Sequence, residues 1–121
     1  MDNEGLPIAF LPISRDSSLE ILRAAFRQAL IEVGHSPDYH LYDLDRDFLV
    51  RKKDYAAGRF LLRLFDFYHS QLDDLEQRIF ICDFLERGRH YRFWWFEYFE
   101  PDDFSATKKA VALRLHTILN F

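Results

Sequence analysis

Residues 61–82 read LLRLFDFYHSQLDDLEQRIFIC, and this stretch decides the fold. Its apolar positions recur alternately four and three residues apart: Leu61, Phe65, Tyr68, Leu72, Leu75, Ile79 and Cys82. Because an α-helix turns about once every 3.6 residues, this spacing places them along one side of a single helix, or of two helices in the same phase. We expect the rest of the chain to pack around this seam.

A second stretch, residues 91–99, reads YRFWWFEYF and contains seven aromatic side chains. The run is short and lacks clean alternation, so its period does not separate a helix from a strand. The main prediction is an all-α fold, a four- to five-helix bundle with a short extended N-terminal arm. The alternative is an α+β fold in which residues 78–85 and 91–99 pair as a hairpin.

The length of 121 residues predicts a single domain over 1–121, with an extended arm over 1–16 and a helical core over 17–121. The arm carries a short apolar run at 8–13, and Pro12 within it argues against a central strand. Such an arm can lie on the core or cross to a second subunit. Together with the 13 Phe and 6 Tyr side chains, it predicts a homodimer.

Local signals predict where the helices begin and end. Ser17 and Glu20 form a capping-box pattern that opens a helix, and Gly34 is expected to end it. Asp43 or Asp45 is expected to cap the next helix. The remaining candidates for caps or breaks are Asp54, Gly58, Ser70, Asp73 and Gly88. Gly58 predicts either a kink or a close approach of two helices.

Composition limits the classes of function. The net charge of −4 weakens any reading as a general nucleic-acid coat protein. Cys82 is the only cysteine, which rules out an internal disulfide and predicts a reducing, cytoplasmic setting. No apolar run reaches the ~18 residues of a spanning helix, so no membrane contact is expected. Cys82 lies on the apolar seam and is expected to fill the core.

The sequence predicts no enzyme, no cofactor and no metal site. Residues 43–54 have the acidic spacing of a calcium loop, but Phe48 stands where that loop needs glycine. A polar loop that caps a helix is the preferred interpretation. His35 and His40 flank Asp38, which would suit a general base, yet no nucleophile is evident beside them.

Residues 70–119 resemble the sigma-factor region-four-like helix-turn-helix domains of small phage-type transcriptional regulators. Residues 72–86, LDDLEQRIFICDFLE, resemble the first helix, and residues 104–115, FSATKKAVALRL, resemble the recognition helix. Residues 91–99 would then form the scaffold helix. The resemblance implies a regulator that binds duplex DNA as a dimer through the C-terminal helix 105–119, with residues 105–114 in the major groove. The DNA-contact candidates are Ser105, Thr107, Lys108, Lys109 and Arg114, joined by the basic residues Arg87, Arg89 and Arg92 beside the aromatic run.

The alternative function is a non-enzymatic protein-interaction or adaptor module. So many aromatic side chains are difficult to bury completely in a small domain, which would leave some of them for a protein partner. The predicted interaction surface comprises Tyr91, Trp94, Trp95 and Tyr98.

Overall fold

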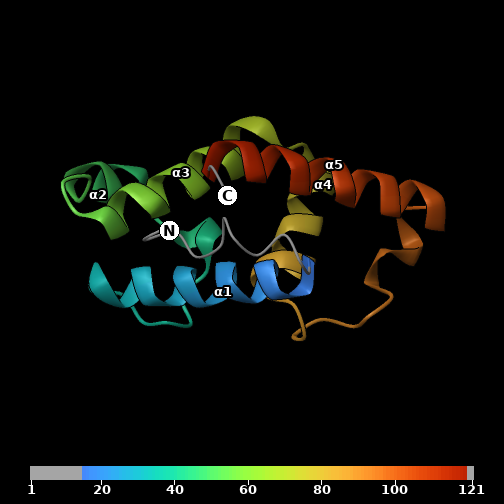
Figure 1. The fold of residues 1–121 in the computed structure, drawn as a ribbon, viewed down its shortest axis with the longest axis horizontal. Helices are drawn as coiled ribbons and strands as arrows, with labels where there is room; N and C mark the ends of the chain where they lie inside the picture. Colours follow the sequence, from blue (N-terminus) through green and yellow to red (C-terminus); the bar gives the residue numbers. More distant parts are fainter. Residues whose placement is uncertain (1–14, 120–121) are drawn as a thin grey trace.

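The computed structural model describes residues 15–119, and all of their regular structure is helical (Figure 1). The elements in order are α1 (Arg15–Glu32), η2 (Leu41–Asp43), α2 (Arg46–Arg51), α3 (Ala56–Gln71), α4 (Asp74–Ile79), η3 (Phe80–Leu85), η4 (Trp94–Glu97) and α5 (Pro101–Leu119). The all-α prediction is confirmed. The hairpin alternative is wrong, because residues 78–85 lie in α4 and η3, and residues 91–99 contain only the turn η4.

The helices form two layers. Figure 1 shows α1 on one side and α3 with α5 on the other, linked at one end by α4 and η3. The core between them is apolar, with Leu22, Leu30, Leu61, Phe67 and Phe80 almost fully buried. No helix of residues 15–119 combines the length and apolarity that crossing a membrane requires.

Helix α1 starts at Arg15, two residues before the predicted start at Ser17. Arg15 and Asp16 therefore belong to the helix, and the rest of the predicted arm lies outside the described residues. The predicted end at Gly34 is confirmed. Gly34 has φ 98°, its amide donates to the Ile31 carbonyl, and the His35 amide donates to the Leu30 carbonyl at 2.8 Å. This is a Schellman ending, which favours glycine because the backbone is left-handed.

Helices α2 and α3 approach each other closely at Gly58. A Cβ atom on Gly58 would lie 2.0 Å from the carbonyl oxygen of Lys52, at the end of α2. The glycine is therefore needed for close approach, and α3 continues through it from Ala56 to Gln71. Asp45 caps α2 as predicted, with its side chain accepting from the Asp47 amide. Tyr55, not Asp54, is the N-cap of α3.

The apolar seam is divided between two helices. Its first part lies in α3, and its second part begins in α4, which Asp73 caps through a complete capping box with Glu76. In α3 the buried residues are Ala57, Gly58, Leu61, Leu64 and Phe67. The predicted seam members Phe65 and Tyr68 are only half-buried. The seam is therefore correct at Leu61, Leu72 and Ile79, but the strict four-three pattern misplaced the buried face of α3.

Helix α4 continues into a π-helical segment, η3, where the hydrogen bonds span five residues. The Glu86 amide donates to the Ile81 carbonyl at 2.8 Å, and Gly88, with φ 92°, follows the end of the segment. The wider turn still buries Phe80, Ile81, Phe84 and Leu85, and it leaves Cys82 and Asp83 half-buried. Asp83, within this segment, and Glu86, directly after it, make the side-chain contacts described below.

Candidate interaction surface

The chain between η3 and α5 leaves the two helical layers. In Figure 1 it runs along one end of the molecule, from the level of α1 to the first turn of α5. Residues 91–99, here called the aromatic segment, form its second half. The segment contains one short regular element, the 3-10 turn η4. The scaffold α-helix expected at 91–99 is therefore not formed.

Two tryptophans attach the aromatic segment to the body of the protein. The Trp94 indole Nε1 donates to Asp83 Oδ1 of η3 at 2.8 Å. The Trp95 ring stacks on Phe104 of α5, with centroids 4.4 Å apart and planes 8° apart. Trp94 also meets the Phe104 ring edge-on at 5.9 Å. Both tryptophans are half-buried, so these two members of the predicted interaction surface chiefly hold the segment in place.

Other aromatic side chains of the segment face solvent. Tyr91 is 73% exposed and Phe96 is 62% exposed, and Phe93 lies between them. The Phe93 ring stacks with Phe96 at 5.3 Å and meets Tyr91 edge-on at 5.9 Å. Tyr91, Phe93 and Phe96 form what we call the exposed aromatic cluster. Tyr98 is also exposed and packs against the guanidinium of Arg78 at 4.9 Å.

Phe93 and Phe96 were missed by the sequence analysis. A run of seven aromatics without helical or strand period gives no signal for which rings point inward. Phe93 is the N-cap of η4 and Phe96 lies three residues later within it, and in a 3-10 helix positions three residues apart eclipse each other. That spacing is the signal that could have paired them.

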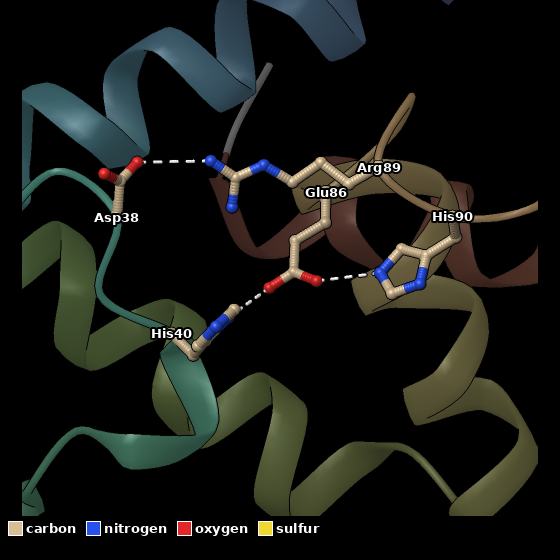
Figure 2. A network of polar contacts seen from close by, with 5 residues as sticks. All are labelled: Asp38, His40, Glu86, Arg89 and His90. Carbon is tan, nitrogen blue, oxygen red and sulfur yellow. Dashed lines mark hydrogen bonds and ion pairs between the residues drawn. The ribbon is translucent and has the colours of Figure 1, made fainter.

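A polar network holds the start of the chain that leads to the segment (Figure 2). The Glu86 carboxylate accepts hydrogen bonds from two imidazoles, His40 Nδ1 on one oxygen and His90 Nε2 on the other, the latter at 2.8 Å. Arg89 Nη2 donates to Asp38 Oδ1 at 3.2 Å. The Glu86 side chain is only 12% exposed. The network ties the loop after α1 to the turn after η3, as Figure 2 shows.

The chemistry of this network is that of a structural clamp. The Nδ1 atom of His40, a possible base by sequence, is hydrogen-bonded to the Glu86 carboxylate. The nearby Cys82 thiol is not activated, because burial, followed by the charges of Asp83 and Glu86, raises its pKa to about 11. A thiol with so high a pKa stays protonated at neutral pH and is a poor nucleophile.

Several of the predicted DNA contacts are ion-paired within the protein. Lys108 Nζ lies 3.0 Å from Asp83 Oδ2. Arg114 pairs with Glu76 and also donates to the Gln71 carbonyl at 2.7 Å. These two cations fasten α5 to the preceding helices. Of the other candidates on α5, Ser105 and Lys109 are exposed and Thr107 is half-buried.

The three other predicted basic residues are all exposed, but they differ in their contacts. Arg89 is paired with Asp38 in the polar network. The Arg92 guanidinium, within the segment, lies 5.5 Å from the centre of the Phe93 ring. Arg87 lies in the turn directly after η3. In the sequence, all three therefore lie at or before the start of the aromatic segment.

Charge is ordered along this part of the chain. Arg87, Arg89 and Arg92 come before or within the start of the exposed aromatic cluster. The acids Glu97, Glu100, Asp102 and Asp103 follow it, and all four are exposed. Among residues 19–119, whose side chains the structure describes, none of these acids has an ion pair. Along the chain, the exposed aromatic cluster therefore has a basic end at residues 87–92 and an acidic end at residues 97–103.

Among the residues that the structure describes, no three His, Cys, Asp or Glu side chains are grouped so as to hold a metal ion. Asp45 in the calcium-like run is used as a helix cap. The chain matches no protein-family model, no curated protein and no solved structure.

Proposed function

We propose that this chain is a non-enzymatic protein-interaction module that binds its partner through the exposed aromatic cluster. One observation carries the proposal: on the surface, the Phe93 ring contacts both Tyr91 and Phe96, while the neighbouring tryptophans are fixed inward. Large exposed aromatic rings leave apolar area in water, which a partner surface would remove. Aromatic side chains also dominate the binding energy of many protein interfaces.

The anchoring of the segment supports the same proposal. The hydrogen bond from Trp94 to Asp83 and the stacking of Trp95 on Phe104 fix the first two residues of η4. A surface that is already ordered loses little conformational entropy when it binds, so more of the contact energy appears as affinity. The expected partner surface is apolar at its centre and carries charges of both signs at its rim.

Duplex DNA binding through α5 has less support. Lys108 and Arg114 already compensate Asp83 and Glu76. To contact phosphates, these cations would have to leave half-buried carboxylates without partners, at a cost in free energy. Exposed acids also follow the basic end of the segment, at Glu97, Glu100, Asp102 and Asp103. The two functions differ in salt response, since phosphate contacts weaken steeply as salt rises and aromatic contacts do not.

Site-specific photo-cross-linking in extracts of the native cells tests the proposal. A photoreactive phenylalanine analogue replaces Phe96 in one variant and Tyr55, which is 63% exposed at the start of α3, in the control. We expect a discrete protein adduct from position 96 that persists at high salt, and none from position 55. The same adducts from both positions, or none from position 96, would contradict the proposal.

A further inference from the structure

Building on the proposed function, we infer that the partner is a second copy of this chain, and that two copies join their exposed aromatic clusters about a two-fold axis. The inference comes from the order of charges around the cluster. Arg92 lies between Tyr91 and Phe93, whereas Glu97 directly follows Phe96 and Glu100 lies three residues further on. Along the chain, positive charge thus comes near the start of the cluster and negative charge follows its end.

A two-fold axis turns this order into complementarity. In a two-fold dimer the same patch lies on both copies and meets itself in reverse, so residue i faces residue j and residue j faces residue i. With the axis through the aromatic cluster, Arg92 of each copy faces the acidic end of the other. Both ends of the interface then pair opposite charges. A partner of uniform charge would match only one end.

The local contacts leave these charges available. Arg92 is exposed and touches the Phe93 ring, and neither Glu97 nor Glu100 has an ion pair among the described residues. By contrast, Lys108 and Arg89 nearby are compensated by Asp83 and Asp38. Arg92, Glu97 and Glu100 are therefore without an ion pair among the residues whose side chains the structure describes.

The aromatic rings suit the same arrangement. The stacked pair of Phe93 and Phe96 in one copy would meet the same pair in the other, and aromatic rings pack well in offset or edge-on groups. Tyr91, the most exposed ring at 73%, would close over the outside of this group. The surface would then have an apolar centre with a charged rim, which is the usual anatomy of a protein interface.

Charge exchange tests the inference on the full chain, by sedimentation velocity and light scattering from micromolar to sub-millimolar concentration. The first variant is Arg92→Glu, which places a negative charge where the other copy presents Glu97 and Glu100. The second carries Glu97→Arg and Glu100→Arg, which places positive charges where the other copy presents Arg92. Arg63→Glu on exposed α3 is the control with the same charge change as the first variant. Circular dichroism confirms that each variant is folded.

We expect the wild-type chain and the Arg63→Glu control to dimerise alike. Each end variant alone should dimerise at least about tenfold more weakly, because like charges then face each other at both ends. An equimolar mixture of the two end variants should recover the dimer, since every facing pair is again of opposite sign. Phe96→Ala should weaken the dimer by about thirtyfold if the ring is a central anchor.

Three results would overturn the inference. One is a wild-type chain that stays monomeric at all concentrations, and another is a dimer that Phe96→Ala leaves unchanged. The third is a mixture of the end variants that does not recover the dimer. The photo-cross-linking adduct from position 96 separates the two proposals. If the chain is monomeric and forms an adduct with a different protein, only the homodimer is refuted. If position 96 forms no adduct, the interaction module is refuted as well.

Discussion

Removing the Asp83 carboxylate should release the aromatic segment from the helical body. Asp83 accepts the Trp94 indole N–H at 2.8 Å and pairs with Lys108 at 3.0 Å. A hydrogen bond to a charged group contributes about 1.5–3 kcal/mol. A partly exposed ion pair adds about 0.2–1 kcal/mol. We therefore expect Asp83→Ala to lower the free energy of unfolding by about 2–4 kcal/mol, which for a domain of this size lowers Tm by about 6–16 °C.

Two matched variants divide this loss between the two contacts. Asp83→Asn keeps an oxygen for the Trp94 N–H and removes the charge, so it should cost about 1 kcal/mol. Lys108→Met removes the ion pair and leaves the hydrogen bond, so its cost should be similar. The double variant Asp83→Asn with Lys108→Met should cost little more than either single change, because both remove the same ion pair.

The assay can follow the segment and the helices separately. Both tryptophans of the chain, Trp94 and Trp95, lie in the aromatic segment, so their fluorescence reports on it, while circular dichroism at far-ultraviolet wavelengths reports on the helices. For Asp83→Ala we expect the fluorescence transition in urea to precede the helical one. Coincident transitions at wild-type stability would refute the role given to Asp83.

Three further predictions address the packing. Gly58→Ala should lower the free energy of unfolding by about 2 kcal/mol or more, although alanine favours helices, because its Cβ would overlap the Lys52 carbonyl. The control Ala110→Gly, at an exposed helix position, measures the change in helix propensity alone. A Gly58→Ala variant as stable as the wild type would contradict the close approach. In thermal unfolding, Trp95→Ala should lower the free energy of unfolding by about 3 kcal/mol and Phe96→Ala by less than about 1 kcal/mol, since only the Trp95 ring stacks on buried Phe104. Equal losses would contradict the assignment of Trp95 as inward and Phe96 as outward. The Cys82 pKa of about 11, against an ordinary value of 9.0, predicts that the thiol is alkylated at pH 8 about a hundredfold more slowly in the folded chain than in the unfolded chain. The contribution of Cys82 to stability should be intact below pH 9 and should decline as pH rises toward 11. Rapid alkylation of the folded chain would contradict this prediction.

The parts of the fold that depend on local sequence were predictable. Helix ends at Gly34 and Asp73 and the cap at Asp45 follow from interactions that reach only a few residues along the chain. The glycine at position 58 was recognised as a kink or a close approach, and only the three-dimensional structure could choose, because the clashing atom belongs to the preceding helix. The all-α class followed from the long helical seam.

The site was harder to predict because its contacts are distant in sequence. The contacting residues Glu86 and His40 are 46 residues apart in the sequence, and Arg114 and Glu76 are 38 residues apart. No local pattern encodes such pairs. The sequence located the aromatic segment and named Tyr91 and Tyr98, which are exposed. It could not distinguish Trp94 and Trp95 from Phe93 and Phe96, because the direction of each ring is set by Asp83 and Phe104.

The π-helical turn η3 gives this protein a place where its length can vary during evolution. Losing the half-buried Cys82 would let η3 relax into a regular α-helix, which costs little in backbone hydrogen bonding. Because a π-helical turn holds about one residue more than an α-helical turn, Asp83 and Glu86 would keep their direction toward Trp94 and His40. A single-residue deletion in the middle of α3 would instead rotate every later side chain by about 100° around the helix. Single-residue deletions should therefore be tolerated in η3 more readily than in α3.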